Sequence, residues 1–278
     1  MMVRGVLCVA VGLGALSAGT ALSQAETVTL DAEAEATIFE DPSLAVGFGR
    51  VFVGSNLQRS TRRGLVRFDL SELPEGEVVS ATLELLVVSQ RGFGLTFDAH
   101  RLLADWSEGP TAGNGSNGGQ GGPATAADAT WTQTGLGASW QAPGGDFEPT
   151  PTASAFSQSA GTRLAFDVAS DVRLFRDGTA ANLGWIVLSQ TEPTSGNVIG
   201  ISTDDEGFPA ITLTVVIEES DPPCPADTNG DGLVTPSDFS AWVQAFNAQG
   251  PACDQNGDGL CTPSDFSSWV QNFNAGCG

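Results

Sequence analysis

A twelve-residue acidic motif occurs twice near the carboxyl end of this 278-residue chain, starting at Asp227 and again 27 residues later at Asp254. Both copies place Asp, Asn and Asp at positions 1, 3 and 5, then Gly at 6, Leu at 7, Thr at 9 and Asp at 12. The candidate ligands are Asp227, Asn229, Asp231, Leu233, Thr235 and Asp238, followed by Asp254, Asn256, Asp258, Leu260, Thr262 and Asp265.

This order of oxygen donors predicts a calcium loop. Ca²⁺ takes about six to eight oxygens at roughly 2.3–2.6 Å from a tightly wound loop. Gly at position 6 permits the sharp turn, the residue at position 7 contributes its backbone carbonyl, and Thr at position 9 ligates directly or through water. A single copy could arise by chance or form a solvated turn, but two copies in one register favour metal binding. We therefore expect two Ca²⁺ ions.

Each motif runs into an apolar stripe with the i, i+3, i+4, i+7 spacing of a helix face. The stripes are Phe239, Trp242, Val243 and Phe246, then Phe266, Trp269, Val270 and Phe273. Two such faces can bury each other, although the 55 residues of 224–278 supply only a small core. We expect bound metal and disulfide bonds to stabilise this small all-α domain.

Four cysteines lie in the same segment, and in sequence order they are Cys224, Cys253, Cys261 and Cys277. An even number in a small exported module predicts two disulfides, for which three connectivities exist. One connectivity joins Cys224 to Cys277 and leaves Cys253 and Cys261 to close a local loop. A zinc site with four thiolate ligands is the alternative, but the spacing contains no C-x-x-C pair.

The amino terminus has the pattern of a secretory signal peptide. Arg4 supplies a positive charge, residues 5–21 are apolar or small, and small-residue cleavage positions extend to Ala25. We expect residues 1–25 to be removed and the protein to be secreted, to the extracellular space or the cell surface. Cys8 offers the alternative of a lipid anchor. No other apolar run approaches the roughly 20 residues that span a membrane.

Charge limits the partners. The chain has 33 acidic and 11 basic residues, a formal net charge of −22. Such a field repels phosphate backbones and anionic membranes, which excludes nucleic acid as a partner. It also disfavours acidic polysaccharides unless calcium bridges the two surfaces. The alternative is that surface acid serves only to keep an exported protein soluble.

Residues 26–217 alternate short apolar strands with turn residues, a pattern typical of an all-β sandwich. The predicted strands are 28–30, 51–53, 64–68, 81–88, 96–103, 163–166, 185–188, 198–202 and 210–217. A short helix is expected near 168–175. The Gly- and Asn-rich stretch 109–122 is predicted to be a mobile surface loop, and the acid- and Pro-rich residues 218–223 a linker.

Few residues of this region suggest chemistry. His100 is the only histidine and has no elbow motif near it, so a packed or surface role is favoured over a Ser-His-Asp arrangement. Arg67 and Asp69 would form a structural or solvated ion pair along one strand. Trp131 and Trp140 border the long loop, where their flat rings would offer platforms for sugars or pack in the core.

The duplicated loops, each with one following helix and with Asp rather than Glu at position 12, resemble the dockerin family. The ending 274–278, Asn-Ala-Gly-Cys-Gly, is similar to the GC-type dockerins of exported planctomycete-like bacterial proteins. The resemblance implies a cohesin-like or cell-surface partner, bound in two orientations related by a half-turn. The chain departs from cellulosome dockerins at Pro236-Ser237 and Pro263-Ser264, the recognition positions, and in its cysteines. A calcium-stabilised structural cap is the alternative.

Five segments of the N-terminal region together resemble the DNRLRE family, also described as family 96 carbohydrate-binding modules. They are 63–71 (RGLVRFDLS), 79–83 (VSATL), 105–109 (DWSEG), 130–131 (TW) and 181–185 (ANLGW). The resemblance implies a jelly-roll-like β-sandwich on exported proteins, some of which bind polysaccharide. The basic residues that family members often carry in the penultimate strand are absent from 199–204 (IGISTD).

The expected architecture is therefore an all-β jelly-roll-like sandwich followed by a small C-terminal all-α calcium-binding, dockerin-like domain. The expected function is that of a secreted, non-catalytic protein whose sandwich binds extracellular polysaccharide and whose dockerin attaches it to a surface or scaffold partner. One alternative is a polysaccharide lyase or glycoside hydrolase that uses dispersed carboxylates and Arg. Another is a purely structural surface or adhesion protein.

Overall fold

The computed structural model describes residues 25–114, 119–203, 211–218 and 224–276. The chain divides into two compact units, with the boundary in the sequence between residues 218 and 219. The expected signal peptide up to residue 24, the linker residues 219–223 and Cys277 lie outside the described residues. We describe each unit by itself.

The first unit is built mainly from strands. Their bounds are β1 (Ala25–Asp31), β2 (Ala34–Phe39), β3 (Leu44–Val46), β4 (Val51–Ser55), β5 (Thr61–Arg67), β6 (Glu77–Arg91), β7 (Leu95–Arg101), β8 (Gly122–Pro123), β9 (Ala153–Ser157), β10 (Arg163–Asp167), β11 (Trp185–Ser189), β12 (Asn197–Ile201) and β13 (Ile211–Glu218). Every pairing between these described strands is antiparallel.

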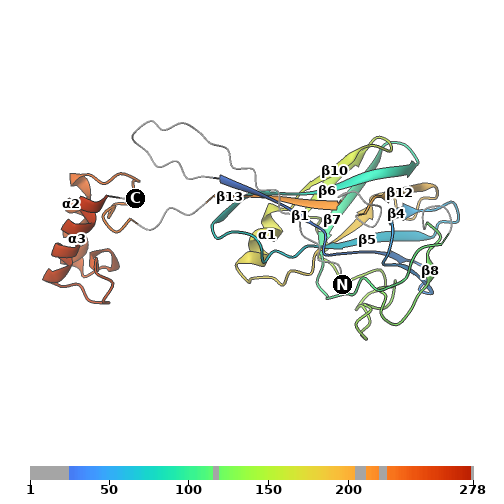
Figure 1. Cartoon of the computed structure of the whole chain (residues 1–278), viewed down its shortest axis with the longest axis horizontal. Coiled ribbons are helices and arrows are strands. Elements are labelled where there is room, and N and C mark those ends of the chain that lie inside the picture. The colour runs from blue at the N-terminus through green and yellow to red at the C-terminus, as the bar shows by residue number, and fades with distance from the viewer. Residues whose placement is uncertain (1–24, 115–118, 204–210, 219–223, 277–278) are drawn as a thin grey trace. The chain divides into compact units, whose positions relative to one another are not determined.

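The strands form the two layers of a sandwich-like fold (Figure 1). One layer contains β1, β13, β6 and β10, and the other contains β12, β4, β5, β2, β11, β7 and β9. The 15-residue strand β6 belongs to both, because residues 77–86 pair with β13 and β10 while residues 87–91 pair with β12. The finer expectation of a jelly-roll arrangement stays a prediction.

Strand β6 shows why the sequence predicted a sandwich. Ala81, Leu83, Leu85 and Val87 are fully buried, whereas the residues between them are partly exposed. This period of two places one side of the strand in a core. The core lies between the layers and includes Phe68, Phe97, Phe166, Trp185, Ile201 and Leu213.

A second core covers the outer face of the layer that contains β2, β5 and β11. Successive residues of β5 divide between the two cores, since Val66 joins the inner one and Leu65 the outer one. The outer core is covered by the segment between β7 and β9, through Leu102, Trp106, Ala129, Trp140 and the partly buried Phe147. This layer is therefore buried on both faces.

The nine predicted strands are confirmed, with boundaries shifted by a few residues, and β2, β3, β8 and β9 were missed. Strand β2 reads AEATIF, and Ala and Glu are depleted in strands, so its sequence gives only a weak strand signal although all six residues are buried. Strands β3 and β8 span only three and two residues. Ala25 and Glu218, expected in the signal peptide and the linker, pair with each other at the ends of β1 and β13, because backbone pairing continues past the apolar pattern.

Helix α1 (Ala169–Arg176) lies within one residue of its predicted position. It packs beside Trp185, whose indole N–H donates a 2.8 Å hydrogen bond to the Oδ2 of Asp171. The rings of Phe175 and Phe68 lie 5.5 and 6.2 Å from the Trp185 ring. Trp185 therefore joins the helix to the inner core.

The second unit contains α2 (Pro236–Ala248), the short 3₁₀ turn η3 (Pro251–Cys253) and α3 (Pro263–Ala275). Both long helices begin with Pro at the first helical position, where its missing N–H costs nothing. Thr235 and Thr262 are their N-caps, each in a capping box. No helix within the described residues is long and apolar enough to cross a membrane.

Replacing Trp185 with Ala is expected to destabilise the first unit by about 3–5 kcal/mol, because it opens a cavity in the inner core and leaves Asp171 without its indole donor. Urea unfolding of the full chain, followed by near-UV circular dichroism, measures the change. Phe156→Ala is the control, since this ring is exposed and its loss should change stability by no more than about 0.5 kcal/mol. Equal effects of the two substitutions would contradict the assignment of Trp185 to the core.

Candidate functional site

The first acidic loop is wound around the carboxylate of Asp227. Its Oδ1 accepts the N–H groups of Gly230 and Asp231 at 2.8 and 3.1 Å, and its Oδ2 accepts the N–H of Gly232 at 2.8 Å. Gly232, at position 6, has a φ of 81°. A residue with a side chain is strained in this conformation, so glycine permits the turn here.

The second loop repeats this network almost bond for bond. Asp254 accepts the N–H groups of Gly257, Asp258 and Gly259 at 2.9, 3.2 and 2.8 Å. Gly259 has the same φ of 81° as its counterpart in the first loop. The two motifs that look alike in sequence therefore fold alike.

The last Asp of each loop ties the loop to its helix. Asp238 is fully buried, and its carboxylate accepts the N–H groups of Thr235 at 2.8 Å and Asn229 at 3.1 Å. Burial alone would raise the pKa of Asp238, but these N–H donors outweigh it and the pKa lies below its ordinary value. The pKa of Asp265 is lowered as well, chiefly by the N–H of Thr262. Both carboxylates are thus held in the charged form.

The charge of this unit is unbalanced. Residues 224–278 contain no Lys, Arg or His, and their acidic residues are Asp227, Asp231, Asp238, Asp254, Asp258 and Asp265. No side chain of the unit can therefore neutralise a carboxylate. The donors of each loop are carboxylate, amide, hydroxyl and backbone carbonyl oxygens, a set that fits a hard cation such as Ca²⁺.

The loop carboxylates do not converge on one point. Among the described residues, no group of three or more His, Cys, Asp or Glu side chains is placed to hold a metal ion. Asp227 and Asp254 face the N–H groups of their own loops instead. The donor set nevertheless fits calcium in its chemistry, because it combines carboxylate, carboxamide, hydroxyl and backbone carbonyl oxygens.

A disulfide joins Cys253 to Cys261, with a Cα–Cα distance of 5.6 Å. Cys224 is disulfide-bonded as well. The local pairing of Cys253 with Cys261 that the sequence allowed is thus present, and the alternative of a four-thiolate zinc site is wrong because these sulfur atoms are not free thiolates.

The predicted apolar stripes pack against each other. Trp242 and Trp269 are both buried, and the ring contacts cross between the repeats. The Phe239 and Trp269 rings lie 5.2 Å apart, and the Trp242 and Phe266 rings 5.6 Å apart. These are ordinary distances for favourable aromatic pairs. The stripes therefore form the shared core of the unit.

Each tryptophan also reaches the loop of the other repeat. The indole N–H of Trp242, on α2, donates to the carbonyl of Cys253 at 3.1 Å, just before the second loop. The indole N–H of Trp269, on α3, donates to the Oγ1 of Thr228 at 3.1 Å, in the first loop. The conformation of each loop is thus linked to the helix of the other repeat.

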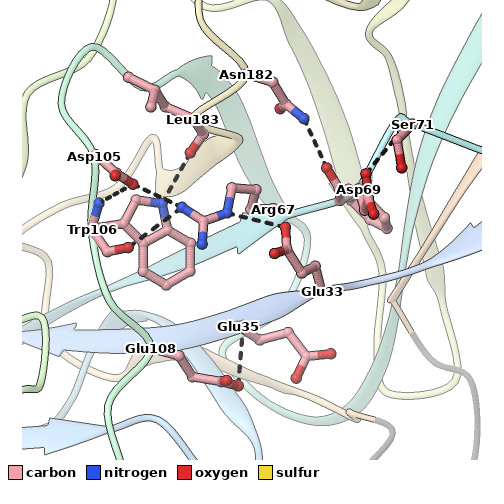
Figure 2. Close-up of polar contacts among 11 residues, drawn as sticks. Glu33, Glu35, Arg67, Asp69, Ser71, Asp105, Trp106, Glu108, Asn182 and Leu183 are labelled. Atoms are coloured by element: carbon pink, nitrogen blue, oxygen red, sulfur yellow. Dashed lines mark hydrogen bonds and ion pairs between the residues drawn. The ribbon is translucent and has the colours of Figure 1, made fainter. Parts of the chain in front are cut away.

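In the first unit, Arg67 is the centre of a polar cluster (Figure 2). Asp105 and Glu33 approach its guanidinium from opposite sides, at 2.8 and 3.3 Å. The predicted ion pair between Arg67 and Asp69 is absent, because β5 ends at Arg67 and Asp69 accepts the N–H of Ser71 at 2.9 Å instead.

Several segments that carry the resemblance to the DNRLRE family meet in this cluster. The indole N–H of the buried Trp106 donates to the carbonyl of Leu183 at 2.9 Å, and the side chain of Asn182 donates to the carbonyl of Phe68 at 2.8 Å. The Arg67 guanidinium lies over the Trp106 ring, 5.4 Å from its centroid. These contacts join β5 to two long connections. They give Arg67, Trp106 and Asn182 a structural role.

The two tryptophans proposed as sugar platforms differ in exposure. Trp140 is only 5% exposed and donates its indole N–H to the carbonyl of Thr130, so it packs in the outer core and cannot present a ring face to a sugar. Trp131 is half-buried, with the Arg63 guanidinium 4.7 Å from its ring centroid. For Trp140 the alternative of core packing holds.

Two polar contacts of Arg63, on β5, could not be predicted from the sequence. Arg63 donates to the Glu192 carboxylate at 3.1 and 3.2 Å and to the carbonyl of Gly144 at 2.8 Å. Glu192 lies 129 residues further along the chain, so no local pattern marks the pair. His100 is buried, with its Nδ1 2.7 Å from the carbonyl of Glu148, which agrees with a structural role.

No protein family model matches the chain, and no curated protein matches it.

The buried Asp128 gives the first unit a predictable response to acid. Burial would raise the pKa of Asp128, but N–H and O–H donors of Thr111 and Thr125, at 2.6–3.0 Å, hold it below its ordinary value of 3.8. A lowered pKa stabilises the fold above pH 4 or so, and this contribution is lost as the pH falls through the folded-state pKa.

Asp128→Asn is therefore expected to cost about 1–3 kcal/mol at pH 7, because an amide cannot accept all four bonds. The difference from the wild type should shrink below pH 3.8, as denaturant unfolding across pH 2–7 would measure. Asp105→Asn serves as control, since its exposed ion pair is worth no more than about 1 kcal/mol. A cost that is independent of pH would contradict the role of the charge.

Proposed function

We propose that this is a secreted, non-catalytic protein in which a polysaccharide-binding β-sandwich is attached to a cohesin-like or cell-surface partner by a calcium-dependent, dockerin-like unit. The observation that carries the proposal is the pair of acidic loops, which fold with matching hydrogen bonds within residues 224–278, a segment that has six acidic and no basic side chains. The resemblance to the dockerin and DNRLRE families supports the same function.

Calcium fits the loops because it supplies the positive charge that the unit lacks. Two divalent ions would offset four of the six negative charges and allow the carboxylates of each loop to approach one another. The ligands would be Asp227, Asn229, Asp231, Leu233, Thr235 and Asp238 in the first loop, and Asp254, Asn256, Asp258, Leu260, Thr262 and Asp265 in the second. Asp238 and Asp265 already hold each loop against its helix.

Attachment to a partner is supported by the exposed apolar side chains of the unit, which come in equivalent pairs. Leu233 and Leu260 are 58% and 63% exposed, and Phe239 and Phe266 are 39% and 44% exposed. The members of each pair stand 27 residues apart, as the loops do. A partner that binds one set of these side chains would meet the same set again after a half-turn, which suits the two orientations expected of a dockerin.

Polysaccharide binding is supported by two exposed aromatic rings of the sandwich, which take the place of the buried Trp140 as candidates. Phe93 is 78% exposed and Phe156 is 53% exposed. Gly94, the residue after Phe93, lies beside the Phe156 ring, because a Cβ added to Gly94 would stand 3.4 Å from that ring. Exposed flat rings suit stacking against the apolar faces of sugars, and the net charge of −22 favours a neutral polymer.

Chelation of calcium with EDTA is expected to lower the melting temperature of the C-terminal unit, because bound ions stabilise the folded state by about 2.7 kcal/mol at 100 times Kd. Asp231→Ala and Asp258→Ala should each reduce the bound ions from two to one in equilibrium dialysis. Asp105→Asn in the sandwich should leave both sites intact. Recovery of no calcium by the full chain at millimolar supply would end the proposal.

The sandwich is expected to be retained on insoluble neutral polysaccharides such as cellulose or chitin, and Phe93→Ala with Phe156→Ala should reduce the bound fraction by about tenfold, since each stacked ring contributes roughly 0.5–1.5 kcal/mol. Val79→Ala is the control for an exposed apolar residue outside the pair. Retention on no polymer, together with self-association, would favour a structural surface protein. Turnover of any polysaccharide would favour an enzyme.

A further inference from the structure

The disulfide between Cys253 and Cys261 closes the second loop only. Cys253 immediately precedes position 1 of that loop, and Cys261 occupies position 8. The first loop has Ala226 and Val234 at the corresponding places. Two loops with the same candidate ligands and nearly the same hydrogen bonds therefore differ in the disulfide that spans positions up to 8 of the second loop, whereas the disulfide-bonded Cys224 lies three residues before the first loop.

This bond should make the second loop the better binding site. The first loop is held by hydrogen bonds alone, so a cation that binds there must restrict the backbone motion that these bonds allow. The disulfide holds residues 253 and 261 with their Cα atoms 5.6 Å apart whether or not a cation is present. A site that is already closed loses less conformational freedom on binding and so binds more tightly.

The tryptophan contacts connect the closed loop to the open one. Trp242 donates to the carbonyl of Cys253, so α2 contacts the disulfide-bonded segment directly. Trp269 follows the second loop on α3 and donates to Thr228 inside the first loop. Ordering of α3 by the second site would therefore fix a hydrogen-bond donor beside the first site.

We propose that the two loops are unequal calcium sites: the disulfide-closed second loop binds first and more tightly, and the Trp269–Thr228 contact then favours binding at the first loop. This inference rests on the proposed calcium function. It also makes the tight site sensitive to reduction. A dithiol reductant would supply two electrons and two protons to convert the disulfide to two thiols, while itself becoming a cyclic disulfide.

The test is calcium titration of the full chain by isothermal calorimetry, comparing the wild type with a variant that carries Cys253→Ala and Cys261→Val. These substitutions give the second loop the residues of the first, so the variant is internally matched. The wild type should show two affinities at least about tenfold apart, and the variant should lose the tighter one. Asp258→Ala should remove the tight site, and Asp231→Ala the weak one.

Trp269→Phe tests the coupling, because phenylalanine keeps a packed ring and loses the N–H donor. It should weaken the first site while the second site keeps its affinity, with helix content checked by far-UV circular dichroism. If the cysteine variant does not fold, the effect of Asp258→Ala and Asp231→Ala on the tight and weak sites still decides the order. Two ions bound with equal affinity in the wild type would overturn this inference and leave the calcium function standing, whereas no bound ion would overturn both.

Discussion

Backbone N–H groups bound to aspartate side chains organise the C-terminal unit. Asp227 and Asp254 close the turns, and Asp238 and Asp265 join each loop to its helix. These carboxylates accept hydrogen bonds from neutral donors only. The N–H dipoles stabilise the negative charges, but no positive side chain neutralises them. The turns that these bonds form position the two aromatic helices against each other. They also position the loops for their contacts with Trp242 and Trp269.

In the sandwich, the layer that contains β2, β5 and β11 is covered by apolar residues on both sides. In strand β5, Val66 packs in the inner core and Leu65 packs in the outer core. The basic side chains Arg63 and Arg67 of β5 bind the long connections through carboxylates and carbonyls. Long segments without regular structure are thus held in place by single arginines that bind several acceptors.

Much of this architecture could be predicted because its determinants are local. The alternation of β6 and the two helical stripes each fit within one element, and each is found as expected. The failures concern residues whose environment is set from a distance. Strand β2 is buried by segments on both of its faces, and Arg67 takes partners 34 and 38 residues away in preference to nearby Asp69.

Trp140 shows the same limit for the candidate site. A tryptophan beside a long loop has no local feature that tells a surface ring from a buried one, and here the segment that covers the outer core buries it. The paired acidic loops were easier to predict as folded units, because each motif falls within twelve residues and the second copy repeats the first.

The two ends of β6 give the sandwich a direction. At one end Glu77 pairs with Glu218, the last residue before the chain continues to the other unit. At the other end Arg91 stands two residues before the exposed ring of Phe93. The strand has 15 residues, so at a rise of about 3.3 Å per residue its ends lie at most about 46 Å apart. The exposed Phe93 ring therefore follows the end of β6 opposite the end at which Glu77 pairs with Glu218.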